Sequence, residues 1–138
     1  YAEGTRVGYR GWYGSDVMPA FWFGAGLGWG VWDYRSAKHH RVDSTESLTV
    51  VLANTAQHVS REVVQVYWRP EGSAPPRLVG YAVADEVVPG EERTVTVECD
   101  PRALRLWDEA ASGWVTPAGG TLLVARGLGD IRLEVPRP

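Results

Sequence analysis

The side chains that could do acid–base, nucleophilic or metal chemistry are few in this sequence and poorly spaced for it. His39 and His40 are adjacent, so in a strand they point to opposite faces and cannot both bind one metal ion, and His58 falls in an expected loop. Cys99 alternates with apolar residues, as a core residue does, and no base lies near it in the sequence. Asp16 lies among aromatic residues, but glycosidase chemistry needs two carboxyl groups about 5 to 10 Å apart, and a turn is the commoner place for a lone aspartate. We therefore expect no catalytic residue and no metal site.

The glycines at every second position from Gly24 to Gly30 come closest to a cofactor motif. A phosphate-binding loop ends in Lys followed by Ser or Thr and joins a strand to a helix, and this segment does neither. The same spacing disfavours regular structure, because each glycine loses backbone entropy without adding a packing surface. We expect no cofactor here and an irregular segment.

The aromatic residues are the feature with a functional interpretation. Residues 1 to 34 hold 10 of the 15 aromatic side chains, which number 7 Trp, 6 Tyr and 2 Phe in all. Such rings can stack on sugars, or they can bury against the rest of the chain or another domain, each removing roughly 150 to 250 Å² from water. The candidates for interdomain contact or sugar stacking are Tyr9, Trp12, Tyr13, Phe21, Trp22, Phe23 and Trp29.

Composition excludes several classes of protein. The net charge is -3, from 14 basic and 17 acidic residues, whereas nucleic-acid and anionic-membrane binders usually carry a basic excess, so we expect neither partner. No apolar run approaches the roughly 20 residues that span a bilayer. The sequence begins with Tyr1 rather than Met, and we expect that its start has been trimmed. Nothing indicates a compartment.

From about residue 31 the dominant hydrophobic period is two, which is typical of half-buried strands. Residues 48–52 and 63–68 carry apolar or aromatic residues on both faces, with only Thr49 and Gln65 polar, and look like strands from a sheet interior, whereas 95–99 and 131–135 alternate apolar with polar. Asp100-Pro101 matches an N-cap followed by proline, so we expect one helical turn from Arg102 to Leu106.

Seven or so short strands with turns every 8 to 12 residues or so predict an all-β fold, an antiparallel β-sandwich of immunoglobulin or fibronectin type III-like form. The first thirty residues do not share the strand pattern. We expect an irregular aromatic- and Gly-rich N-terminal arm at residues 1–30 and a sandwich at residues 31–138.

The order and spacing of several arm residues resemble one segment of glycoside hydrolase family 3 enzymes, which leaves their α/β sandwich domain. The family typically has E-G, then G-Y-R-x-Y-D, then P-x-F-P-F-G-x-G-L-S-Y-T. The matching residues here are Glu3-Gly4, Gly8-Tyr9-Arg10, Trp12, Pro19, Phe21, Phe23-Gly24, Gly26-Leu27 and Trp29.

The rest of the chain resembles the fibronectin type III-like domain that follows in the same enzymes, so the resemblance covers nearly the whole sequence. Eight short motifs in this part of the chain agree in register. They are Asn54-Thr55, Glu62-Val63-Val64-Gln65-Val66-Tyr67, Gly80-Tyr81, Pro89-Gly90-Glu91, Leu106-Trp107-Asp108, Gly113-Trp114, Gly119 and Asp130-Ile131-Arg132-Leu133.

The resemblance implies a non-catalytic piece of a β-glucosidase- or β-xylosidase-like enzyme. In the family the nucleophile and the acid/base residue lie in domains upstream of this region, and no residue here matches either motif. The chain departs from the family where Tyr13 replaces an Asp, Trp22 replaces a Pro, and Gly28-Trp29-Gly30 replaces Ser-Tyr-Thr. These changes make the arm more aromatic and more flexible.

Three hypotheses follow. The leading one is an accessory C-terminal domain that braces the catalytic domains of the parent glycosidase through its arm, without glycosidase activity of its own. The alternative is a free-standing carbohydrate-binding module that stacks sugars on Trp12, Trp22 or Trp29. The third is that the arm, without its natural partner, mediates self-association or folds back on its own sandwich.

Overall fold

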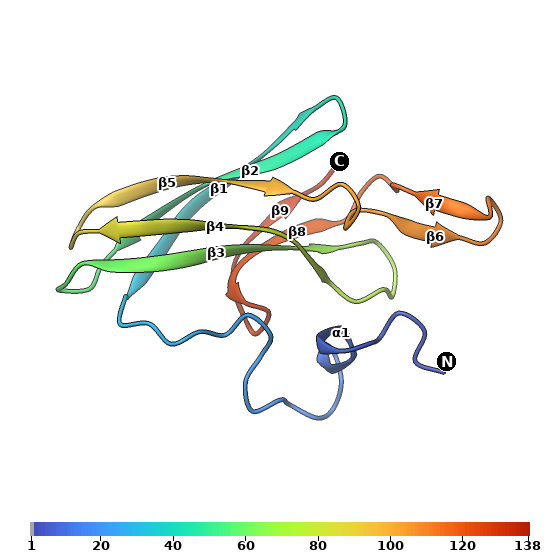
Figure 1. Cartoon of the computed structure of the whole chain (residues 1–138), viewed down its shortest axis with the longest axis horizontal. Helices are drawn as coiled ribbons and strands as arrows, with labels where there is room; N and C mark the ends of the chain where they lie inside the picture. Colours follow the sequence, from blue (N-terminus) through green and yellow to red (C-terminus); the bar gives the residue numbers. More distant parts are fainter. Residues whose placement is uncertain (1) are drawn as a thin grey trace.

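The structure, a computed structural model, describes residues 2–138, so Tyr1, the first residue of the expected arm, lies outside the described residues. The predicted all-β sandwich is confirmed, and an irregular arm precedes it (Figure 1). The described elements are α1 (Tyr9–Trp12), β1 (Trp32–Val42), β2 (Thr45–Asn54), β3 (Ser60–Arg69), β4 (Arg77–Val87), β5 (Glu92–Cys99), β6 (Leu106–Asp108), β7 (Gly113–Val115), β8 (Thr121–Gly127) and β9 (Asp130–Pro136).

Two antiparallel sheets form the sandwich. One has three strands in the order β1-β2-β5, and the other has four in the order β4-β3-β8-β9. The registers set the alternating residues of neighbouring strands side by side, with Leu48 opposite Val97 and Val66 opposite Val124. The short strands β6 and β7 form a separate hairpin that projects from the end of the sandwich, at the right of Figure 1.

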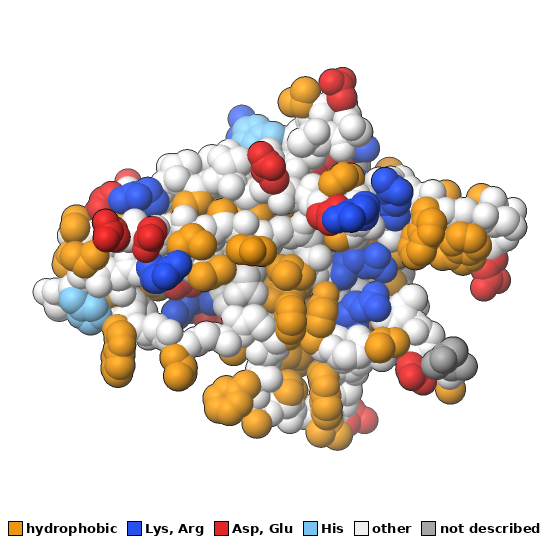
Figure 2. Space-filling view, viewed as in Figure 1, with side chains coloured by type: hydrophobic (Ala, Val, Ile, Leu, Met, Phe, Trp, Pro, Cys, Tyr) orange, Lys and Arg blue, Asp and Glu red, His pale blue; other side chains and the backbone are white. Residues whose placement is uncertain are grey.

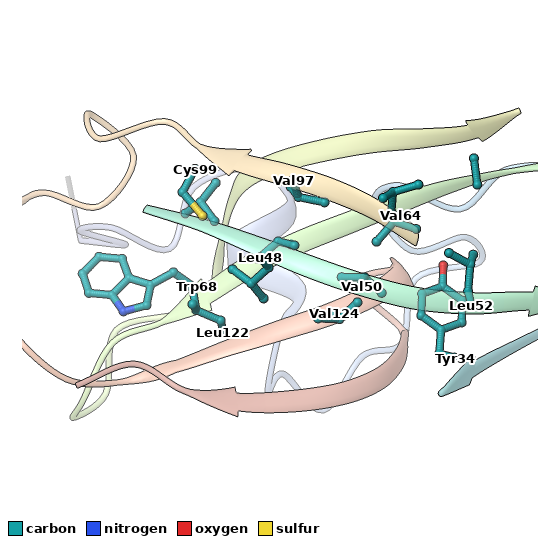
Figure 3. Close-up of a cluster of buried hydrophobic side chains, with 14 of the residues drawn as sticks. Tyr34, Leu48, Val50, Leu52, Val64, Trp68, Val97, Cys99, Leu122 and Val124 are labelled. Carbon is teal, nitrogen blue, oxygen red and sulfur yellow. The ribbon is translucent and has the colours of Figure 1, made fainter. Parts of the chain in front are cut away.

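The core lies between the two sheets. Leu48, Val50 and Leu52 of β2 face Val64 and Trp68 of β3, and all five are fully buried (Figure 3). The strands show a period of two because every second side chain points into the space between the sheets. Burial of each large apolar side chain there stabilises the fold by about 1.5 to 3 kcal/mol.

The helical turn expected from Arg102 to Leu106 does not form as a helix. Asp100 does cap the segment, because its Oδ1 accepts a hydrogen bond from the Arg102 amide at 2.9 Å and its carbonyl oxygen accepts one from the Ala103 amide at 2.9 Å. Leu106, however, is already the first residue of β6, so the chain extends after one turn. The described helix is α1, four residues long, and no helix among residues 2–138 is long and apolar enough to cross a membrane.

Candidate functional site

The arm lies against the outer face of the four-stranded sheet, below it in Figure 1. A second apolar cluster forms there, separate from the core between the sheets. Its buried members are Tyr67 and Leu123, with Ala125 and Leu128, and the arm residues packed against it are Tyr9, Tyr13 and Trp22. From Val64 to Trp68 both faces of β3 are therefore covered, one by the opposite sheet and one by the arm.

Tyr9 and Phe23 come from the two halves of the arm and meet on Tyr67. Their rings are stacked with centroids 4.1 Å apart, and each meets the Tyr67 ring edge-on at 6.5 Å. The Tyr9 hydroxyl also accepts a hydrogen bond from the Leu78 amide at 2.9 Å. Aromatic pairs in these geometries contribute about 0.5 to 1.5 kcal/mol beyond the area they bury, so this cluster holds the arm to the sheet.

Gln65 of β3 supplies the polar part of the attachment. Its Nε2 donates to the carbonyl oxygens of Gly24 at 2.9 Å and of Arg126 at 2.7 Å, and its Oε1 accepts a hydrogen bond from the Tyr67 hydroxyl at 2.6 Å. The Leu128 amide donates to the carbonyl oxygen of Phe23 at 2.9 Å. Burial raises the pKa of Tyr67, so its hydroxyl stays protonated and able to donate.

Two glycines permit the close approach of arm and sheet. Gly24 has φ of +82°, and a Cβ there would clash with Gln65 Oε1 and lie 2.7 Å from the Tyr67 hydroxyl oxygen. At Gly129, which follows β8, a Cβ would clash with the indole of Trp22. The bare backbone at both positions is therefore a requirement of this attachment.

Other arm residues point away from the sheet. Phe21 is 82% exposed and Trp29 87% exposed, Leu27 is fully exposed, and Trp12 is about half exposed. Trp29 is attached through its backbone alone, because its carbonyl oxygen accepts a hydrogen bond from His58 Nε2 at 2.9 Å. Figure 2 shows apolar side chains along the underside of the molecule, where the arm runs. Large exposed apolar side chains gathered on one segment are typical of a surface that contacts a partner or a ligand.

The predicted candidates therefore fall into two groups. Tyr9, Tyr13 and Trp22 pack against the sandwich of this chain, and Phe23 lies between the groups, because it stacks on Tyr9 yet stays 42% exposed. The outward group consists of Trp12, Phe21 and Trp29.

A groove of about 950 Å³ is lined on one side by arm residues between positions 20 and 29 and on the other by residues of the sandwich. Phe21, Trp22 and Trp29 line its aromatic side. The opposite side carries six charged residues among uncharged ones, namely Arg61, Glu62, Asp85, Glu86, Arg126 and Asp130. Aromatic faces opposite charged hydrogen-bonding groups are the ingredients of a site for polar ligands with apolar faces.

Glu62 is the buried carboxylate of this groove. Its Oε1 accepts hydrogen bonds from the Tyr34 hydroxyl at 3.0 Å and from Arg126 Nε at 2.8 Å. Burial raises the pKa of Glu62, and the neighbouring Arg126 opposes that rise without cancelling it. Burial also raises the pKa of Tyr34, and the Glu62 charge adds to the effect. Because Tyr34 of β1 and Arg126 of β8 both donate to one oxygen of Glu62, this side chain links β1 and β8 to β3.

The remaining residues that could do chemistry lie elsewhere. Asp16 is exposed and outside the groove lining, and Cys99 is buried in the core. His39 Nε2 lies 2.9 Å from Glu46 Oε2, on the three-stranded sheet. In the part of the chain that the structure describes, no three His, Cys, Asp or Glu side chains gather so that they could hold a metal ion.

The sequence did not single out the sandwich residues that hold the arm, which are Gln65 and Tyr67 of β3. The available signal was the run from Val63 to Trp68, in which Gln65 is the one polar amide among apolar and aromatic residues. Such a strand needs cover on both sides, and the sandwich supplies only one.

Comparison with known proteins gives two concordant findings. A family model described as the fibronectin type III-like domain matches residues 62–126. The thermostable β-glucosidase B of Acetivibrio thermocellus is 30% identical over 142 residues, and a β-glucosidase of Bacteroides ovatus is also 30% identical over 142 residues. These matches cover 97% and 96% of this chain but only 19% of each relative, so the chain spans about a fifth of their length.

Solved structures agree. DesR, a β-glucosidase from Streptomyces venezuelae, superposes with a TM-score of 0.87 at 31% identity, over 99% of this chain and 18% of that one. β-Glucosidase 3B from Thermotoga neapolitana gives 0.86 at 26% identity, over 99% and 19%. The superposition includes the arm, and the matched portion is too small to contain a whole enzyme of this kind. The chain matches the C-terminal fibronectin type III-like domain of glycoside hydrolase family 3 enzymes.

Proposed function

We propose that this accessory domain of a glycoside hydrolase braces the catalytic domains of a β-glucosidase-type parent enzyme, with residues 1–30 acting as the arm and residues 31–138 as the sandwich. The observation that carries the proposal is the division of the arm. Tyr9 and Trp22 fasten it to the sheet, while Phe21, Leu27 and Trp29 project outward from the fastened backbone. A segment that is attached on one side and apolar on the other is suited to contact a second protein domain.

The energetics favour a protein partner. Burying each of Phe21, Leu27 and Trp29 stabilises an interface by about 1.5 to 3 kcal/mol. Because Tyr9, Phe23 and Gln65 already order the backbone of the arm, little further ordering entropy opposes docking. The chemistry of hydrolysis belongs to the upstream domains in this proposal, so the 138-residue chain alone should not hydrolyse an aryl β-glucoside.

The test is binding between the chain and the separately produced upstream part of its reading frame, measured by calorimetry. We expect Leu27→Ser with Trp29→Ser to raise Kd at least 100-fold. The matched control is Val42→Ser, because Val42 is also exposed but lies in the β1–β2 hairpin at the top of Figure 1, away from the arm. Absence of binding by the unmodified chain, or an equal effect of the control, contradicts the brace.

The groove favours a second candidate, a carbohydrate-binding module. Trp22 and Trp29 could stack on sugar rings while Asp85 and Arg61 meet hydroxyl groups. Titration of tryptophan fluorescence with cello- and xylo-oligosaccharides separates the two. A saturable change that is lost in Trp29→Ala supports the module; no change up to millimolar sugar supports the brace. Trp29 is the better probe, because Trp22 also fastens the arm.

Self-association is the third candidate. Two copies could bury the outward residues of the arm against each other. Sedimentation of the full chain and of a chain that starts at Val31 tests this, since an arm-driven dimer requires that only the longer chain be dimeric. Substitution of Leu27 and Trp29 by serine should then dissolve the dimer without removing the arm.

A further inference from the structure

The arginines of this chain divide by whether a carboxylate pairs with them. Of the 13, which with Lys38 make up the 14 basic residues, nine lie within 4.0 Å of an Asp or Glu oxygen. Among residues 2–138 the other four form no such pair, and they are Arg6, Arg10, Arg77 and Arg105.

These four residues lie at one end of the molecule although they come from three segments. Arg77 Nη1 donates to the carbonyl oxygen of Arg105 at 2.8 Å, and Arg6 Nη2 donates to the carbonyl oxygen of Ser73, in the loop before β4, at 3.2 Å. Burial lowers the pKa of Arg77, and the nearby positive charge of Arg10 lowers it further. Figure 2 shows basic side chains between the β6–β7 hairpin and the arm. We call Arg6, Arg10, Arg77 and Arg105 the arginine face.

The arginine face is not neutralised from within the described chain. Four carboxylates lie nearby in the sequence, namely Glu3, Glu71, Asp108 and Glu109. Among residues 2–138 none of them forms an ion pair with the arginine face. Arg77 Nε is moreover a buried donor without an acceptor in that part of the chain. Four like charges held together oppose folding, so a face of this kind indicates a counter-charge outside the described chain.

Exposed tryptophans flank the arginine face. Trp107 and Trp114 form a cross-strand pair on the β6–β7 hairpin, with ring centroids 5.7 Å apart and ring planes at 78°, and both are more than half exposed. Trp12 of α1 lies on the arm side, two residues after Arg10. Arg and Trp are the residue types most enriched where protein interfaces gain their binding energy.

We infer that the arginine face is a docking surface for an acidic patch on the domain that precedes this chain in the parent enzyme, with Trp12, Trp107 and Trp114 at its edge. The inference rests on the proposed bracing function and adds the chemistry of the partner. It assigns the β6–β7 end of the sandwich, remote from Leu27 and Trp29, as a second and electrostatic point of attachment.

Two observations select a carboxylate-bearing protein surface as the occupant. Guanidinium groups bind carboxylates with two parallel hydrogen bonds, so arginine suits a fixed protein contact better than a diffuse counter-ion. The chain spans 19% of its relatives, so a parent enzyme of their length would place a longer neighbouring part next to the arm that carries Arg6 and Arg10. A nucleic acid fits less well, because the chain as a whole carries a charge of -3.

The test measures binding of the upstream domains to the full 138-residue chain at 50 and 300 mM NaCl. In the first variant Arg6, Arg10 and Arg105 become Gln, while the partly buried Arg77 is retained so that folding is preserved. We expect Kd at 50 mM NaCl to rise at least 10-fold, and the salt dependence of Kd to flatten. The variant should melt at no lower temperature than the parent chain, because removing like charges does not oppose folding.

A matched control removes the same charge from paired, exposed arginines: Arg35, Arg61 and Arg102 become Gln. Its Kd should stay within 3-fold of the parent value. Equal losses in the two triple variants, or binding that is independent of salt, overturn the inference and leave the brace standing. Failure of every chain to bind overturns the brace itself. Tighter binding of a 20-residue thymidine oligonucleotide than of the upstream domains at 150 mM NaCl also overturns the inference.

Discussion

Arg137, the residue after β9, forms a buried two-point ion pair with Glu46 of β2. Its Nε and Nη2 donate to the two carboxylate oxygens at 2.9 and 2.7 Å, across 91 positions of sequence. Its Nη1 donates to the carbonyl oxygen of Pro117 at 2.7 Å, and the guanidinium lies 5.4 Å from the centre of the Trp68 ring. Nε, Nη1 and Nη2 of Arg137 therefore each have an acceptor, and the ion pair links the two sheets of the sandwich.

Loss of the cation from this pair should be costly. Burial disfavours the Glu46 anion, but the hydrogen bonds and charge of Arg137 outweigh it, and the net result is a lowered Glu46 pKa. We expect Arg137→Met to reduce the free energy of unfolding at pH 7 by about 3 to 5 kcal/mol, because it leaves a buried carboxylate without its main partner. The double variant with Glu46→Gln should recover part of this. Urea denaturation measures both.

The sign of the pH dependence follows from the lowered pKa. A carboxyl that is more acidic when folded stabilises the protein above its unfolded pKa, about 4.3, and that contribution is lost as pH falls through the folded value. The gap between the parent chain and Arg137→Met should therefore close below about pH 4. A gap that stays constant from pH 7 to pH 3 would show that packing of Arg137, rather than its charge, is responsible.

Gly24→Ala should loosen the arm and leave the sandwich folded. The new Cβ would clash with Gln65 Oε1 and sit at a φ of +82°, which is strained for alanine by about 1 to 3 kcal/mol. We expect hydrogen exchange of the Leu128 amide, which donates to the Phe23 carbonyl oxygen, to accelerate about 10- to 100-fold. Gly26→Ala is the control, since a Cβ there meets nothing within 4 Å. Equal exchange rates in the two variants would refute this account of the attachment.

The sandwich follows from local patterning, whereas the site does not. Alternation along 48–52 and 95–99 predicts which side chains enter the core, because burial and strand period are local properties. The arm is fastened by contacts over 41 positions, from Gly24 to Gln65, and 69 positions, from Tyr9 to Leu78. No periodicity in the arm reports such partners, so the sequence singled out the aromatic rings as contact candidates but could not say which of them would pack on their own sheet.

Arg126→Met should destabilise the protein more at high pH than at low pH. The pKa of Glu62 is already raised by burial despite Arg126, and removal of the cation raises it further. A carboxyl whose folded pKa exceeds its unfolded value binds its proton more tightly when folded, so the free energy of unfolding falls as pH rises between the two values. We expect a loss of about 3 to 5 kcal/mol at pH 8 and a smaller loss at pH 5, measured by denaturant unfolding.

Two further variants make this test specific. Arg102→Met removes an equally charged side chain that is exposed and paired with Asp100, and it should leave the free energy of unfolding nearly unchanged at either pH. Adding Glu62→Gln to Arg126→Met should abolish the difference between pH 5 and pH 8. If Arg126→Met lowers the free energy of unfolding equally at pH 5 and pH 8, then Glu62 stays charged in the folded variant without Arg126.

Cys99 should report on the opening of the sandwich rather than act as a reactive thiol. It lies opposite Glu46 in the β2–β5 register, and burial raises its pKa to about 12, with the charge of Glu46 adding to the effect. Only about one thiol in ten thousand is then ionised at pH 8, so labelling by a disulfide reagent should require that β5 open.

Because Arg137 holds Glu46 in place beside this strand, Arg137→Met should accelerate labelling in proportion to its loss of stability. The exposed Val88→Ser variant, between β4 and β5 and at the other end of β5 from Cys99, should not. Rapid labelling of the unmodified chain at pH 8 would place Cys99 outside the closed core.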